Sequence, residues 1–146
     1  MVAVQPRSLA ELLGVKPRKA AFTALDLAEA IRAGLPVATI DRLCAVIAPG
    51  DPSLRHRIVP RATLARRQRA AMGRLSAEES GRLARLAQVW SLATDVWGSD
   101  AAARQFMAEP HPLLGGRIPR EVATETDIGA RAVEDLLGGL KYGTAV

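Results

Sequence analysis

Hydrophobic positions along the chain recur with helical periodicity. The clearest stripe alternates spacings of three and four, which places its members on one helix face: Leu83, Leu86, Trp90, Ala93 and Trp97. Residues 76–79 read Ser-Ala-Glu-Glu, which is typical of a capping box, and Gly98 follows the stripe. This pattern predicts the longest helix, running to about Trp97. Its stripe is interpreted as the main core seam or as a dimer seam, because the spacing alone does not establish a coiled coil.

Shorter helices are predicted on both sides of this one. Before it we expect helices at 25–33, from Pro36 to a turn at 48–52, at 53–58 and at 61–71. The second of these has one apolar face, made of Val37, Ile40, Leu43 and Ile47. After it we expect helices at 99–108, at 119–123 and from Thr126 or Asp127 to Leu140, with residues 141–143 breaking the last.

Composition agrees with an all-α fold. Hydrophobic residues make up 49% of the 146 residues and aromatic residues only 3%, whereas the good helix formers Ala, Leu and Arg are abundant. We predict a flexible basic arm at 1–22 with one or two helical turns, a helix-turn-helix-like bundle at 23–75, and a small helical domain at 76–146.

Charge is distributed unevenly along the chain. The net charge is +5, but residues 51–75 carry seven Arg against one Asp, whereas residues 118–146 carry three cations against five acids. A basic middle and a mildly acidic end suggest two tasks on one chain. The single cysteine, Cys44, forms no intrachain disulfide and is expected in the core. With no signal peptide and no apolar run of about 20 residues, we expect a cytoplasmic protein without membrane contact.

No catalytic constellation is visible. The two histidines, His56 and His111, have no metal-ligand spacing with each other or with Cys44, and we interpret them as surface or structural residues. Gly115-Gly116 lacks the frame of a phosphate-binding loop. We therefore expect no enzyme activity, no metal, no cofactor and no small-molecule substrate.

The strongest local signal lies at residues 58–69. Ile58 and Leu64 can face a core while the polar side chains face outward, and a short helix with a tight turn precedes this segment. Arginine and threonine can bind phosphates and base edges, so the candidate DNA-binding residues are Arg61, Thr63, Arg66, Arg67 and Arg69. The alternative interpretation is a solvated basic helix.

Several segments, in order, resemble the Xre/MbcA/ParS antitoxin family, whose usual partner is a toxin with a RES domain. They are residues 34–36 with 40–43, 59–67, 74–83, 112–119, 129–137 and 141–143. The resemblance spans about residues 34–143 and is more specific in the C-terminal half. Residues 51–57 depart from the pattern, because they make a poor first helix of a helix-turn-helix.

This resemblance implies an Xre-like DNA-binding N-terminal part and a C-terminal part that dimerises and holds a toxin. It implies a toxin that breaks down NAD, with the antitoxin's C-terminal end at or near the toxin's active-site cleft. The candidate toxin-binding residues are Gly115, Gly116, Arg117, Glu134, Lys141, Tyr142 and Gly143.

Alternatives remain open for the loop at 115–117 and for Tyr142. The glycine pair with Arg117 is either a structural turn or part of the toxin face. The ring of Tyr142, expected on a short tail, either anchors in a cleft or covers the last helical turn. The acidic last helix, with Glu134 and Asp135, is expected to meet a basic rim around the toxin's cleft.

The function predicted is an antitoxin that occludes a RES-domain toxin and represses its own operon by binding operator DNA as a homodimer. One alternative is an antitoxin that has lost DNA binding. Another is a transcriptional regulator with a C-terminal sensor or dimerisation domain and no toxin partner.

Overall fold

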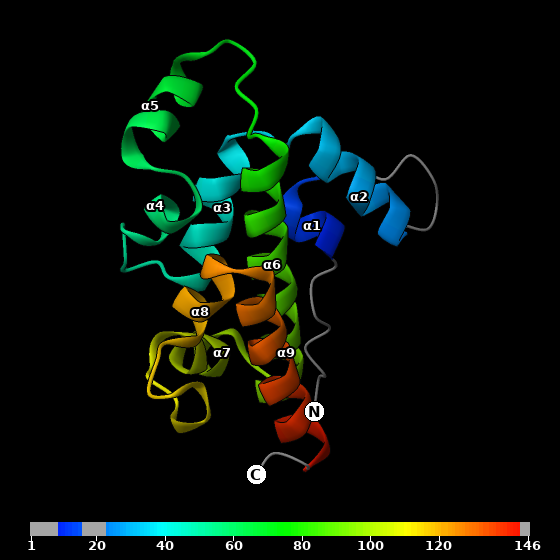
Figure 1. Cartoon of the computed structure of the whole chain (residues 1–146), viewed down its shortest axis with the longest axis vertical. Helices are drawn as coiled ribbons and strands as arrows, with labels where there is room; N and C mark the ends of the chain where they lie inside the picture. The colour runs from blue at the N-terminus through cyan, green and yellow to red at the C-terminus, as the bar shows by residue number, and fades with distance from the viewer. Residues whose placement is uncertain (1–8, 16–22, 144–146) are drawn as a thin grey trace. The chain divides into compact units, whose positions relative to one another are not determined.

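A computed structural model of the chain describes residues 9–15 and 23–143. Within them lie isolated bridges but no strands, so the predicted all-α fold is confirmed there. None of their helices combines the length and the apolar character needed to cross a membrane. The elements, shown in Figure 1, are α1 (Leu9–Leu13), α2 (Ala24–Ala33), α3 (Ala38–Ile47), α4 (Leu54–Ile58), α5 (Arg61–Arg69), α6 (Ala77–Trp97), α7 (Asp100–Ala108), the 3-10 helix η1 (Pro112–Leu114), α8 (Pro119–Glu125) and α9 (Asp127–Tyr142).

The chain divides into two compact units, and the division falls inside α6, between Ala84 and Arg85. We call the described residues up to Ala84 the N-terminal unit and residues 85–143 the C-terminal unit. The sequence placed the boundary before residue 76, at the start of this helix. The first two turns of α6 belong instead with the N-terminal unit, where the Ser80 hydroxyl accepts a hydrogen bond from the Leu35 backbone N–H at 2.9 Å.

The core of the N-terminal unit is built around α3. The predicted apolar face is confirmed, since Ile40, Leu43 and Ile47 are buried and Cys44 lies beside them. Helix α1 packs against α3, with the Leu13 carbonyl accepting a hydrogen bond from the Thr39 hydroxyl at 3.4 Å.

The segment that forms α1 was expected to belong to the flexible arm. It is helical as predicted, but its side chains Ala10, Leu12 and Leu13 are buried, so it is part of the N-terminal unit. The apolar patch seen in the sequence is therefore a core contribution. The rest of the predicted arm, residues 1–8 and 16–22, lies outside the described residues.

The link between α5 and α6 runs back along the segment that precedes α3. The Leu75 N–H donates to the Leu35 carbonyl at 2.9 Å, and the Val37 N–H donates to the Gly73 carbonyl at 3.1 Å. This approach requires glycine at position 34, where φ is +90° and a Cβ atom would lie 2.3 Å from the Leu75 carbonyl oxygen. The link is therefore fixed by backbone contacts on both sides.

The C-terminal unit packs α8 and α9 against each other, with Ala130, Val133, Leu136 and Leu137 as the buried face of α9. Thr126 caps α9 by accepting a hydrogen bond from the Gly129 N–H at 2.9 Å. The predicted break at 141–143 is wrong in part. Helix α9 continues through Tyr142, because a single glycine with φ +69° ends a helix only at its own position.

The long apolar stripe of α6 is confirmed as core at Leu83, Leu86, Trp90 and Ala93, which are at most 2% exposed. Trp97 differs, because 43% of its surface is exposed. It is the last residue of α6, so no further helical turn covers its indole.

Candidate functional site

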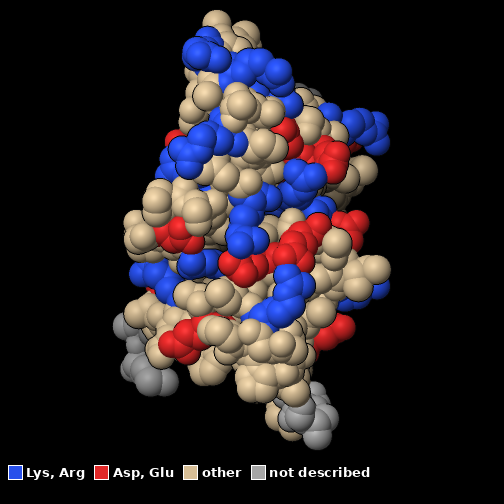
Figure 2. Space-filling view, turned by 60° about the vertical axis from the view of Figure 1, so that its left-hand side comes forward, with Lys and Arg blue, Asp and Glu red and all other residues tan. Residues whose placement is uncertain are grey.

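The candidate DNA-binding residues lie on α5 and divide into two groups. Arg61, Arg66 and Arg69 are exposed, and they make no hydrogen bond or ion pair within the described part of the chain. Figure 2 shows basic side chains gathered at its top, over α5. Because phosphate contacts need exposed cations, these three arginines are the available phosphate ligands.

Arg67 and Thr63 lie on the other side of the same helix, next to the buried Leu64. Both are half-buried. The Nε atom of Arg67 lies 2.9 Å from Oε1 of Glu79, and its Nη1 donates to the Arg74 carbonyl at 3.4 Å. Arg67 is therefore engaged inside the N-terminal unit rather than presented to a ligand.

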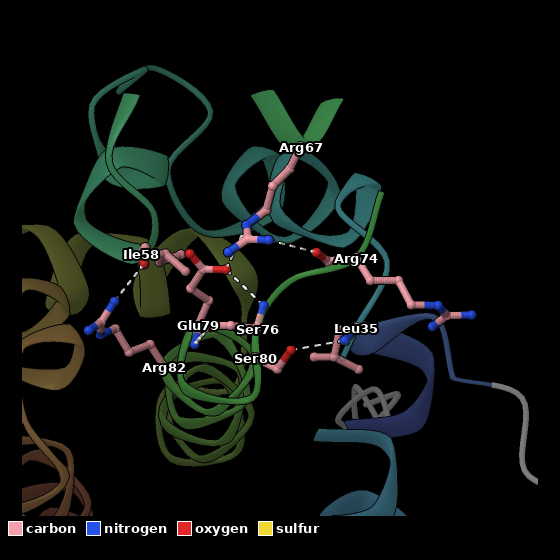
Figure 3. A network of polar contacts seen from close by, with 8 residues as sticks. All are labelled: Leu35, Ile58, Arg67, Arg74, Ser76, Glu79, Ser80 and Arg82. Atoms are coloured by element: carbon pink, nitrogen blue, oxygen red, sulfur yellow. Dashed lines mark hydrogen bonds and ion pairs between the residues drawn. The ribbon is translucent and has the colours of Figure 1, made fainter. Parts of the chain in front are cut away.

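Glu79 of α6 contacts Arg67 of α5, a contact that the sequence did not predict. Only 7% of it is exposed, and its carboxylate faces Arg67 on one side and the start of α6 on the other (Figure 3). It accepts the Ser76 N–H at 2.8 Å, while the Ser76 hydroxyl accepts the Glu79 N–H at 3.1 Å. The predicted capping box is thus confirmed, and its glutamate has a second task in holding α5.

Two further arginines tie the same region together. Arg82 on α6 donates to the Ile58 carbonyl at the end of α4 at 3.0 Å, and Arg74 donates to the Gly34 carbonyl at 2.9 Å. The carbonyl of Ile58 is the last of its helix and has no partner further along it. These contacts fix α4, α5 and the start of α6 relative to one another, so α5 presents its exposed face on a rigid support.

The short helix before α5 is formed as expected. Helix α4 buries Leu54 and Ile58, and the Val59-Pro60 link that follows leads directly into α5, whose Leu64 is also buried. The Arg55 guanidinium lies 2.8 Å from the Asp41 carboxylate on α3. Residues 51–57 looked weak in sequence, yet Leu54, the next buried residue Ile58 and the ion pair between Arg55 and Asp41 hold this part of the chain against α3.

The second group of candidates begins with the loop between η1 and α8. Gly115 and Gly116 have φ values of +64° and +77°, and both are exposed. The loop closes on itself, because the His111 N–H donates to the Arg117 carbonyl at 3.0 Å and the Gly116 N–H donates to the His111 carbonyl at 2.9 Å. The Arg117 guanidinium binds the Glu125 carboxylate, whose hydrogen bond raises the pKa of Arg117. This loop is accordingly an ordered, exposed turn.

The remaining candidates lie on α9. Tyr142 is 74% exposed at the end of the helix, and Glu134 is half-buried on its middle turns. The ammonium of Lys141 lies 2.5 Å from the Asp95 carboxylate on α6, and this hydrogen bond raises the pKa of Lys141. The pair fixes the last turn of α9 to α6 while leaving the tyrosine ring exposed. Asp95 and Glu125, both missed in the sequence, thus position candidates that it did identify.

Comparisons with known proteins divide the chain in the same order. Residues 26–88 match the family described as the antitoxin Xre-like helix-turn-helix domain. Residues 92–143 match the family described as the antitoxin Xre/MbcA/ParS C-terminal toxin-binding domain. A curated relative, an antitoxin Xre from Yersinia enterocolitica, is 39% identical over 120 residues, covering 80% of this chain and 79% of the relative.

Proposed function

Because this chain belongs to the Xre/MbcA/ParS antitoxin family, we propose that it neutralises a RES-domain toxin and represses its own operon. Family membership makes this chain the antitoxin of a toxin–antitoxin system, with a helix-turn-helix domain and a toxin-binding domain. The identity of the toxin, its degradation of NAD, the homodimer and autorepression are the proposed parts. The toxin's identity, its degradation of NAD and the homodimer rest on the resemblance noted in the sequence, and autorepression is supported in addition by the exposed arginines of α5.

The observation that carries toxin neutralisation is the presentation of Tyr142. Its ring is exposed at the end of a helix inside the matched toxin-binding region, and the neighbouring Lys141 is fixed to Asp95. A tyrosine offers a large apolar face and a polar tip, which makes it a good anchor in a partner's pocket. In this proposal the end of α9 enters the toxin's cleft and excludes its substrate.

The glycine loop and the acidic face of α9 extend the same contact. Gly115 and Gly116 allow the partner's backbone to approach closely, and Glu134 favours a basic rim around a cleft that binds an anionic dinucleotide. Reversing the charges of Glu134 and Asp135 is expected to weaken toxin binding. Unchanged binding would remove the acidic face from the proposal.

The experiment is co-expression with the protein encoded by the neighbouring gene. We expect that protein to be toxic alone, the full chain to rescue growth, and a truncation after Leu140 to fail. A truncation after Gly143 is the matched control, because it keeps the end of α9. Rescue by the chain that ends at Leu140 would contradict occlusion by the helix end. A neighbouring protein that is harmless when expressed alone would contradict the toxin partner and favour a regulator without one.

Autorepression rests on the three exposed arginines of α5. A dimer would present two such helices to paired half-sites in successive major grooves. Arg66→Glu with Arg69→Glu is expected to abolish operator binding and to spare toxin neutralisation. If neither activity changes, the chain acts on the toxin alone. Arg67 is unsuitable for this test, because a glutamate there would face the buried Glu79.

A further inference from the structure

The C-terminal unit contains a pocket that none of the candidate residues accounts for. It lies where α6 ends and α7 turns into the segment before η1, and its volume is about 290 Å³. This volume lies at the lower end of the range for small-molecule sites, roughly 300–1,000 Å³, and it has room for one long side chain. Its lining residues are Trp97, Ala102, Gln105, Phe106, Glu109, Pro110 and His111.

Three rings form the walls of the pocket. The rings of Trp97 and Phe106 have centroids 5.9 Å apart, and the Phe106 and His111 rings are 5.9 Å apart in an edge-on arrangement. His111 is fixed by its own turn, since its Nδ1 accepts the Leu113 N–H at 3.1 Å. The exposed indole of Trp97 at the end of α6 thus forms one wall of this pocket rather than part of the core.

A carboxylate completes the lining. Glu109 is exposed and accepts a hydrogen bond from the neutral amide of Gln105 at 3.2 Å, and it forms no ion pair with a described cation. Aromatic faces together with an uncompensated carboxylate attract a cation, because the ring quadrupole and the carboxylate act in the same direction. Charge complementarity therefore selects a positively charged side chain as the occupant.

The pocket is also continuous with the proposed toxin-binding surface. His111, one of its walls, exchanges backbone hydrogen bonds with Gly116 and Arg117 of the exposed loop. Asp95, which holds Lys141 beside Tyr142, lies two positions before Trp97 on α6, so these two side chains project from different sides of the helix. A partner that covers the exposed loop would therefore also reach the pocket at His111.

We propose that this pocket receives one arginine or lysine side chain of the toxin. The proposal rests on the proposed function, and it adds a second anchoring point to Tyr142, with the direction of recognition reversed. At one point the antitoxin inserts an aromatic ring into the toxin, and at the other it encloses a cation that the toxin inserts.

The first test needs no toxin. The full chain is titrated with N-acetyl-arginine methylamide while the indole N–H signals are followed by NMR, and the Trp97 signal is assigned with Trp97→Phe. We expect the Trp97 signal to shift until it saturates, with half-saturation at a millimolar concentration of the ligand. The neutral analogue N-acetyl-citrulline methylamide should cause a shift at least fivefold smaller, and Glu109→Gln should reduce this difference, because only the attraction of the rings for the cation then remains. Equal shifts with both compounds, or no shift with either, would overturn the proposal that the pocket binds a cation, whatever the identity of the toxin.

The second test measures the affinity of the complex with the toxin. Glu109→Gln is expected to weaken toxin binding about tenfold, while Glu29→Gln, an exposed glutamate on α2, serves as the matched control without effect. An unchanged affinity would overturn the proposal even if neutralisation itself is confirmed. If Glu109→Gln instead dissociates a dimer and spares toxin binding, the cation comes from a second copy of this chain and the toxin is excluded as its source.

Discussion

The guanidinium of Arg67 lies 2.9 Å from the carboxylate of Glu79, which also caps the first turn of α6. One buried acid therefore joins the helix that presents the basic face to the helix that continues into the C-terminal unit. The pairing also removes Arg67 from the residues available to DNA. It separates Arg67, which supports the helix, from the exposed arginines of α5, which are available to DNA, and this leads to two opposite expectations for neighbouring arginines.

Replacing Arg67 by alanine should reduce stability more than it reduces DNA affinity. The substitution leaves the Glu79 carboxylate buried without its counter-ion, and we expect a loss of about 1–2 kcal/mol in the free energy of unfolding. Urea denaturation measures this loss. Arg66→Ala, one residue away and exposed, is the control and should stay within about 0.5 kcal/mol. Equal losses for the two variants would show that the pair contributes nothing.

Operator binding should depend on salt to the extent set by the exposed arginines. If a dimer places three arginines per protomer on phosphates, six contacts give a log–log slope of about −5. Arg66→Ala removes two of these contacts per dimer and should reduce the slope to about −4 or −3. Fluorescence anisotropy with labelled operator DNA at several salt concentrations gives the slope. A value near zero would rule out α5 as a phosphate-binding helix.

Gly34→Ala should destabilise the N-terminal unit strongly. The new Cβ would meet the Leu75 carbonyl at 2.3 Å in a backbone conformation that alanine rarely adopts, so we expect a loss of about 2 kcal/mol or more. Gly50→Ala is the matched control, because a Cβ there meets no atom within 4 Å, and its effect should stay within about 1 kcal/mol. Thermal unfolding of the two variants measures the contrast, and similar melting temperatures would contradict it.

Tyr142→Ala should weaken toxin binding without affecting the fold. The side chain is 74% exposed, so its removal changes few contacts within the chain, whereas loss of an aromatic anchor of about 2 kcal/mol corresponds to about 30-fold in affinity. Tyr142→Phe keeps the ring and isolates the contribution of the hydroxyl. Calorimetric titration with the toxin gives both affinities. An alanine variant that binds as tightly as the parent chain would mean that the ring merely covers its own helix end.

Local signals in the sequence located the helices well. The capping residues Thr23, Ser76, Ser99 and Thr126 each accept a backbone N–H at the start of a helix, and their neighbours in sequence suffice to identify them. The buried stripes of α3 and α6 follow from periodicity for the same reason. Such signals depend on residues three or four positions apart, which the chain itself brings together.

The contacts that define the sites depend on distant residues and were not predictable in this way. Glu79 lies twelve positions from Arg67, and Asp95 lies 46 positions from Lys141, so neither pair has a periodic signature. Trp97 kept the spacing of the stripe, yet the helix ends there and leaves its ring at the surface. Sequence spacing therefore identified which residues carry charge or rings, while tertiary packing decides which of them a partner can reach.

The different settings of the two tryptophans have a spectroscopic consequence. Trp90 is 2% exposed, with the Arg104 guanidinium 5.9 Å from its ring, whereas Trp97 is 43% exposed at the pocket. The emission of the native chain should accordingly contain a blue-shifted component from the first and a red-shifted, readily quenched component from the second. Iodide or acrylamide should select the second component, and a partner seated against the pocket should shield it. The fluorescence of Trp97 can thus report on partner binding without any added label, and Trp90, seven residues earlier in the same helix, serves as the internal reference.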